Sequence, residues 1–253
     1  MKRILVLYRF LFFACYTAWI VALVFWNRKV LRRDTARVML VRRRWARRVL
    51  SGVGVRVETL GTPPDRPCLL LGNHRSYLDP ILMLRNVDGF PVAKAELASW
   101  PLIGKGAQWA GILYLKREQK ESRASTVRAI ADVIQVQGFP VILFPEGTTS
   151  DLPGMLPLKK GSFRTAAKWG LPVAPVAICF ADTRDFWVGK ASFLEHAWAR
   201  FQEPVIHVRL IYGPIFEGTD SDWLEAQVRD WIEQQLLEHP PQNQSITSPA
   251  QQP

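Results

Sequence analysis

The chain has 253 residues and a formal net charge of +11, from 33 Lys/Arg and 22 Asp/Glu residues. This length suits one domain with an appendage, enough to bury a full core. The charge is uneven, because residues 1–48 hold 13 of the Lys/Arg residues and one acid, Asp34, which leaves the rest of the chain close to neutral. A nucleic-acid-binding domain carries its basic residues on the folded face, so this distribution argues against a nucleic-acid partner.

A nearly continuous apolar run extends from Ile4 to Trp26 and is interrupted by Arg9. As a helix, the uninterrupted part from Phe10 onward would be about 25 Å long at ~1.5 Å per residue, against a hydrocarbon core of about 30 Å. Its aromatic ends and basic flanks favour a membrane-associated helix over a buried core helix. A short span and insertion in one leaflet both fit, whereas a cleaved signal peptide lacks its small-residue cleavage site here.

Between Val30 and Leu50, apolar residues recur at helical spacing and arginines occupy the other faces of the predicted helix. Such a basic amphipathic helix lies on an anionic membrane surface. The alternative is a solvated, charged helix packed on the domain. Because arginine-rich flanks stay in the cytoplasm, we expect residues 1–50 to anchor the protein to the cytoplasmic face of the inner membrane.

From residue 51 to 239, apolar runs of strand length alternate with helical patterns. The alternation predicts an α/β fold, with a mostly buried mixed sheet flanked by helices and preceded by the membrane-associated helices. Residues 240–253 are rich in Pro, Gln and Ser and are predicted to be disordered. The predicted strands cover residues 53–60, 68–71, 90–93, 112–115, 141–144, 173–180 and 205–212, and the predicted helices cover 80–85, 121–136, 163–169 and 223–237.

Several kinds of chemistry have no signal in the sequence. Cys15, Cys68 and Cys179 lie far apart in apolar segments, so we expect no disulfide. No Cys/His cluster has metal-ligand spacing, and the sequence has no dinucleotide or Walker loop. It also lacks the Gly-x-Ser-x-Gly elbow of serine hydrolases. We therefore expect no metal and no cofactor, and a base that activates a group brought by the substrate.

The most informative motif is Asn-His-Arg-Ser-Tyr-Leu-Asp-Pro at residues 73–80. On a straight helix, His74 and Asp79 would be about 140° apart around the axis and would not meet. They meet if the chain turns between a strand and a helix capped by Asp79, with Pro80 at its first position. His74 is then a candidate general base oriented by Asp79. In the alternative, Asp79 only caps the helix and His74 only satisfies a turn.

A second motif, Phe-Pro-Glu-Gly-Thr-Thr-Ser, occupies residues 144–150 after a predicted buried strand. A turn of this kind, with a glycine that permits close backbone approach, can offer N–H and hydroxyl donors to an anion. Each nearby cation is either a phosphate ligand or a solvated surface charge, and Glu146 is either a ligand or a structural acceptor. The candidate substrate-binding residues are Arg117, Glu146, Gly147, Thr148, Lys159 and Lys160.

From about residue 52 to 215, the sequence resembles the glycerolipid acyltransferase family, the 1-acyl-sn-glycerol-3-phosphate acyltransferases and their relatives. Four blocks carry the resemblance in order, at residues 73–79, 111–117, 144–148 and 174–178. The resemblance implies that His74 is the base and Asp79 its orienter. It also implies that Arg117 and the Glu146-Gly147-Thr148 turn hold the acceptor's phosphate.

The same resemblance implies that acyl-CoA or acyl-carrier protein donates the acyl chain and that a lysophospholipid in the membrane accepts it. One residue departs from the family pattern: Thr149 stands where an arginine often follows Gly-Thr. Lys159 or Lys160 is a candidate replacement, and a lyso-ornithine lipid is an alternative acceptor. A non-catalytic membrane-tethering module with the same fold is a further alternative.

Overall fold

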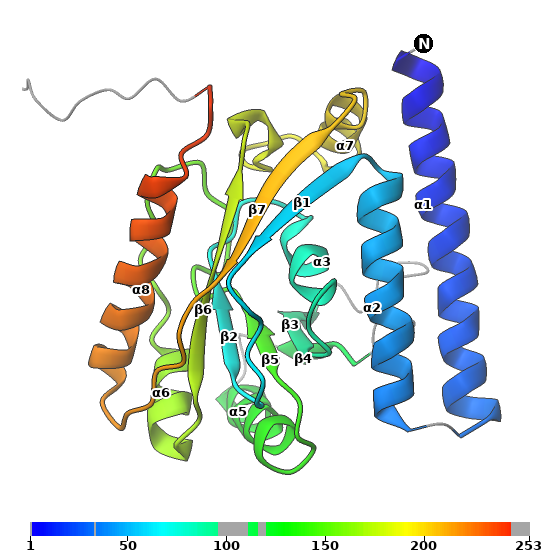
Figure 1. Cartoon of the computed structure of the whole chain (residues 1–253). Coiled ribbons are helices and arrows are strands. Elements are labelled where there is room, and N and C mark those ends of the chain that lie inside the picture. Colours follow the sequence, from blue (N-terminus) through cyan, green and yellow to red (C-terminus); the bar gives the residue numbers. More distant parts are fainter. Residues whose placement is uncertain (1, 33, 96–110, 116–119, 244–253) are drawn as a thin grey trace, which may run out of the picture.

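The computed structural model describes residues 2–32, 34–95, 111–115 and 120–243, which contain a seven-stranded sheet in the order β1-β7-β6-β2-β5-β3-β4 (Figure 1). Strands β6, β2, β5, β3 and β4 are parallel to one another. Strand β7 runs antiparallel to β6, and β1 pairs with β7 in the parallel direction. The predicted mixed sheet is therefore confirmed. The strands are β1 Val55–Leu60, β2 Leu69–Gly72, β3 Phe90–Lys94, β4 Leu113–Leu115, β5 Val141–Leu143, β6 Val173–Phe180 and β7 Ile206–Tyr212.

Helices cover both faces of the sheet. Alternate residues of the central strand β2 point to opposite faces, and each set packs under its own group of helices. Leu70 belongs to a core cluster under α2, α3 and α7, while Leu69 and Leu71 belong to a second cluster under α5, α6 and α8. A continuous apolar run is what a parallel strand buried on both faces requires. These helices are α2 Thr35–Gly52, α3 Asp79–Leu84, α5 Lys120–Gln135, α6 Gly161–Trp169, α7 Phe193–Arg200 and α8 Ser221–Glu238.

Two features of the carboxy-terminal half differ from the sequence-based expectations. Helix α7 was not predicted; it begins with a capping box in which Ser192 and Glu195 bond each other's backbone N–H. The first residues of the segment predicted to be disordered, 240–253, bond the domain, because Gln242 donates its backbone N–H to the Ala181 carbonyl and the Asn243 side chain donates to Asp182. Residues 244–253 lie outside the described part of the chain.

Helix α1 (Lys2–Phe25) continues through a π-helical turn (Trp26–Val30), and among the described residues this is the one helix long and apolar enough to cross a membrane. It packs along α2 on one flank of the molecule (Figure 1). Arg9, which interrupts the apolar run, is 4% exposed. Its guanidinium donates to the carbonyls of Phe201, Glu203 and Pro204 at 2.9, 2.6 and 2.7 Å. The interruption therefore fastens the apolar helix to the domain.

Helix α2 begins later than predicted, at Thr35, because the Asp34 side chain caps it by accepting the Arg37 N–H at 2.9 Å. Its apolar side does not face outward as a membrane-surface helix requires. Val38 and Val41 pack with Ile20 and Val24 of α1. Further along α2, Arg42 is buried and donates to the Gly89 carbonyl, and the exposed arginines are Arg37, Arg44, Arg47 and Arg48. The alternative of a charged helix packed on the domain therefore describes α2 better.

Replacing Arg9 with Met should detach α1 from the domain, because three carbonyls lose a charged donor at a buried position. We expect a loss of roughly 2–4 kcal/mol in the free energy of unfolding, measured by denaturant titration in detergent micelles. Arg3→Met removes the same charge from an exposed position of the same helix and should change stability little. Equal unfolding midpoints for the two variants would contradict this account of Arg9.

Candidate active site

The turn between β2 and α3 brings His74 and Asp79 together. The distance from His74 Nδ1 to Asp79 Oδ2 is 2.7 Å, with the histidine side chain 22% exposed and the carboxylate fully buried. The same Oδ2 accepts the backbone N–H groups of Arg75 at 2.6 Å and Ser76 at 2.7 Å. Asp79 is therefore not the helix cap that the sequence indicated. It lies in the first turn of α3, whose cap position is Leu78, and its carboxylate turns back to the preceding loop.

This contact selects the proton position on the imidazole ring. A carboxylate held by two amide donors accepts from Nδ1–H, so the lone pair of neutral His74 lies on Nε2. Within the described residues, no hydrogen bond occupies Nε2. The ring stacks on Phe144, with centroids 4.5 Å apart and planes 21° apart. The ring is thus held on one edge and one face, and its basic nitrogen remains available to a substrate.

Side chains of the same motif fix the loop around the histidine. Asn73 pairs with the backbone of Ile178 on β6, accepting its N–H at 2.8 Å and donating to its carbonyl at 2.9 Å. Arg75 donates to the carbonyls of Ser150 at 2.9 Å and Gly154 at 2.8 Å, and burial lowers its pKa. Asn73 and Arg75 were not among the predicted site residues, although both lie in the motif. Their buried polar groups hold the strand end and the second loop in place.

Glu146 links the two motifs directly. Its Oε1 accepts the backbone N–H of His74 and its Oε2 accepts that of Leu156, both at 2.8 Å. The side chain is almost fully buried, and burial raises its pKa while the two amide donors and Arg75 oppose that shift. Both carboxylate oxygens are already engaged by protein, so the geometry matches the structural-acceptor interpretation of Glu146.

The turn after Glu146 depends on glycine. Gly147 has φ +73° and donates its N–H to the Phe144 carbonyl at 3.0 Å, a conformation that other residues adopt only with strain. Thr148 follows it at an exposed position. The Thr148 side chain is therefore accessible to solvent in this turn, and Gly147 shapes the backbone beside it.

The predicted cations do not all converge on His74. Arg117 lies outside the described residues. Lys160 donates from Nζ to Asp222 in the first turn of α8 at 2.9 Å, so its charge is engaged by another helix. Lys159 has an exposed side chain, and its backbone N–H bonds Pro145 at 2.9 Å in the loop behind the site. Lys159 and Thr148 thus have exposed side chains, and the Lys160 ammonium is paired with α8.

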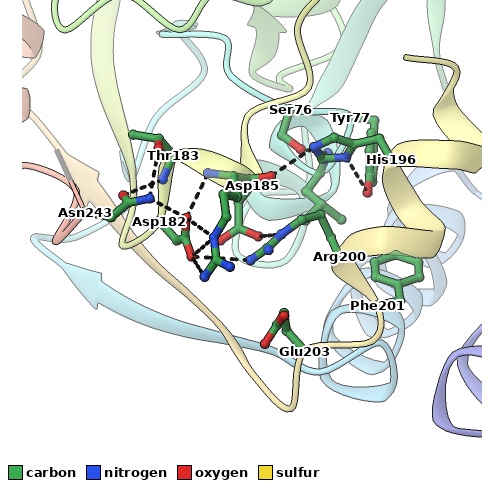
Figure 2. A network of polar contacts seen from close by, with 12 residues as sticks. Ser76, Tyr77, Asp182, Thr183, Asp185, His196, Arg200, Phe201, Glu203 and Asn243 are labelled. Carbon is green, nitrogen blue, oxygen red and sulfur yellow. Dashed lines mark hydrogen bonds and ion pairs between the residues drawn. The ribbon is translucent and has the colours of Figure 1, made fainter. Parts of the chain in front are cut away.

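A network that the sequence did not predict supports the turn between His74 and Asp79 from the side of α7 (Figure 2). His196 lies 3.3 Å from the Tyr77 hydroxyl through Nδ1 and 3.1 Å from the Arg184 carbonyl through Nε2. The carbonyl requires the proton on Nε2, so Nδ1 accepts from Tyr77. Arg200 bonds Asp185 at 2.7 Å, and burial lowers the pKa of His196. Helix α7 is thereby tied to the loop between His74 and Asp79.

No group of three or more His, Cys, Asp or Glu side chains in the described part of the chain has the arrangement of a metal site. What the site offers is a carboxylate-oriented imidazole at the carboxyl edge of parallel strands, next to a glycine turn. These features define an enzyme class in which a histidine base activates an external hydroxyl, as in acyl transfer.

Comparison with known proteins agrees with this class. The family model described as Acyltransferase matches residues 54–179. The chain is 33% identical over 197 residues to a 1-acyl-sn-glycerol-3-phosphate acyltransferase of Neisseria meningitidis serogroup B, covering 75% of this chain and 76% of that protein. It is 35% identical over 200 residues to the lyso-ornithine lipid O-acyltransferase of Rhizobium meliloti, covering 71% and 67%. The chain belongs to the acyltransferase family of these proteins.

More distant relatives extend the comparison. The human 1-acyl-sn-glycerol-3-phosphate acyltransferase alpha is 30% identical over 178 residues, and the chain spans 60% of its length. The crystal structure of the 1-acyl-sn-glycerophosphate acyltransferase from Thermotoga maritima has the same fold, with a TM-score of 0.74, 23% identity, and coverage of 94% of this chain and 97% of that one. That structural match includes the amino-terminal helices as well as the sheet.

The glycine turn can be tested with a matched pair of substitutions. Gly147→Ala places a Cβ at φ +73°, and Gly138→Ala does the same at φ +74° in the loop before β5, where a Cβ meets open space. Each should cost about 1–2 kcal/mol of folding stability from left-handed strain. Only Gly147→Ala should also lower the rate of acyl transfer, expressed per amount of folded protein. Equal activity in the two variants would show that the turn has no part in the reaction.

Proposed function

We propose that this protein transfers a fatty acyl group from acyl-CoA or acyl-carrier protein to the free hydroxyl of a lysophospholipid, 1-acyl-sn-glycerol-3-phosphate, giving phosphatidic acid. The observation that carries the proposal is the His74–Asp79 pair, which leaves the imidazole Nε2 available at a partly exposed position. Family membership supports the reaction class, and the apolar α1 supports a membrane substrate.

In the proposed reaction, His74 Nε2 takes the proton of the acceptor hydroxyl while the oxygen attacks the thioester carbonyl. Asp79 stabilises the imidazolium that forms, because its Oδ2 remains bonded to Nδ1–H. The new C–O bond forms and the C–S bond breaks. A thiol has a pKa near 8.5, so it leaves with little acid assistance, and the imidazolium then returns the proton to it.

The acceptor headgroup depends on the cations that the protein can bring to it. Thr149 replaces an expected arginine, and Lys160 is engaged by Asp222, so a phosphate would depend on Arg117, Thr148 and Lys159. This reduced set of cations favours a second candidate, a lyso-ornithine lipid, whose headgroup carries no phosphate. The 35% identity to a lyso-ornithine lipid O-acyltransferase supports the same candidate.

We further propose that α1 inserts in one leaflet at the cytoplasmic face of the inner membrane. Arg9 binds the domain near one end of α1, and Ile20 and Val24 pack on α2 near the other. A helix fastened along its length beside a water-exposed domain is poorly placed to cross both leaflets, because the domain would have to follow it. The arginine-rich segment that follows α1 favours the cytoplasmic side of the membrane.

Replacing His74 with Ala, or Asp79 with Asn, should lower acyl transfer by about 10³-fold or more, since the first removes the base and the second favours the wrong tautomer. Both variants should remain folded and membrane-bound. His207→Ala, at an exposed position of β7, is the matched control and should keep wild-type activity. The measurement is transfer of a labelled acyl group in isolated membranes. Full activity in His74→Ala would exclude the mechanism.

The acceptor can be identified by supplying the same membranes with a panel of lysolipids. Preference for lysophosphatidate would support the first candidate, and preference for lyso-ornithine lipid the second. Thr149→Arg should then raise the rate with lysophosphatidate, because it restores a planar cation beside the Thr148 turn. Transfer to neither lipid would contradict both candidates.

A further inference from the structure

Helix α7 and the amino-terminal half of α1 expose apolar side chains next to each other. On α7, Leu194 is 64% exposed and Trp198, one turn later, is 41% exposed. The Trp198 ring stacks on Phe10 of α1, with centroids 6.0 Å apart and planes 23° apart. Beside Phe10, the α1 residues Leu7 and Leu11 are also exposed. We call these five residues the α1–α7 apolar surface.

The two helices that form this surface are fixed to each other. The buried guanidinium of Arg9 donates to carbonyls in the segment that directly follows α7, those of Phe201, Glu203 and Pro204. Phe10 also packs on the ring of Phe201, with centroids 5.6 Å apart. The Arg9 side chain is buried in this contact, while Glu203 in the same segment is partly exposed. Where α1 meets lipid, α7 must therefore lie beside the same lipid.

The charges around α7 suit a lipid surface. Glu195 follows Leu194 in the chain, but its carboxylate is directed to the backbone and hydroxyl of Ser192 at the helix start. Before the helix, Lys190 and Arg184 are exposed, the latter paired with Asp182. Tryptophan favours the membrane–water interface and basic residues favour anionic headgroups. The apolar pair Leu194 and Trp198, with Lys190 as an exposed cation before the helix, thus fits a monolayer of anionic phospholipid.

The catalytic turn lies directly behind α7. Tyr77, between His74 and Asp79, packs edge-on against Phe193 with centroids 4.8 Å apart, and its hydroxyl contacts His196 (Figure 2). We propose that α7 is a membrane-contacting element, in which Leu194 and Trp198 enter the same leaflet as α1 and hold the His74 turn at the lipid surface. This inference rests on the proposed action of the protein on membrane lipids.

The experiment uses the full chain with Cys15→Ser, because Cys15 is exposed whereas Cys68 and Cys179 are buried. Single cysteines are introduced as Leu11→Cys in α1, Leu194→Cys in α7 and Leu237→Cys in α8. Leu237 is 78% exposed, and α8, the helix to which it belongs, lies on the opposite flank of the molecule from α1, which makes it the matched control (Figure 1). Each variant carries a polarity-sensitive fluorophore and is placed in vesicles of phosphatidylcholine and phosphatidylglycerol, with or without brominated acyl chains.

We expect brominated lipids to quench the labels at positions 11 and 194 by about twofold or more, as for side chains buried at the acyl boundary, and to leave the label at 237 unchanged. Quenching at 11 without quenching at 194 would overturn the role of α7 while leaving membrane association intact. A blue-shifted but unquenched label at 194 would indicate a protein partner, such as a second copy, and would also overturn it. Quenching does not require acyl transfer, so this result is independent of the proposed reaction.

Discussion

The candidate site depends on one buried oxygen atom. Asp79 Oδ2 accepts three donors, the backbone N–H groups of Arg75 and Ser76 and the Nδ1–H of His74. The two amides stabilise the ionised carboxylate, and the carboxylate in turn determines which ring nitrogen carries the proton. The amides come from the residues that immediately follow the histidine. The loop that carries the base therefore also holds the group that orients it.

The second motif completes this arrangement through its acid. Glu146 accepts the His74 N–H with one oxygen and the Leu156 N–H with the other, so strand ends from β2 and β5 are bonded to each other through a single side chain. This link explains why a negative residue stands in a turn that the sequence suggested for binding an anion. Its charge is satisfied inside the protein, and the glycine and threonine after it form the surface of the turn.

Sequence reasoning succeeded where one residue pattern has one physical consequence. The apolar run at residues 68–71 predicted a short buried strand, and the positions of His74 and Asp79 predicted a turn between that strand and the next helix. It failed where the partner is distant in the chain. Nothing near Arg9 indicates that its guanidinium reaches carbonyls about 190 residues later, and Lys160 has no local sign of its bond to Asp222.

Helix α7 is a different case, because its signal was present in the sequence. Ser192 and Glu195 have the spacing of a capping box, but the helix after them has only eight residues, too few for a periodic apolar pattern. The periodicity of α2 also identified its apolar face correctly. It did not identify what covers that face, which is α1 and the domain and not a membrane surface, because periodicity shows only that a face is buried. The contacts with α1 and the domain resolve that ambiguity.

The central claim, that Asp79 holds His74 with its proton on Nδ1 and its lone pair on Nε2, can be measured directly. Nitrogen-15 NMR of histidine-labelled protein in detergent micelles, with the His74 signals identified by their loss in His74→Gln, reports the protonation of each ring nitrogen in the neutral ring. The account predicts a protonated Nδ1 and an unprotonated Nε2, with the opposite tautomer favoured in Asp79→Asn. A protonated Nε2 in the neutral ring of the wild-type protein would contradict it.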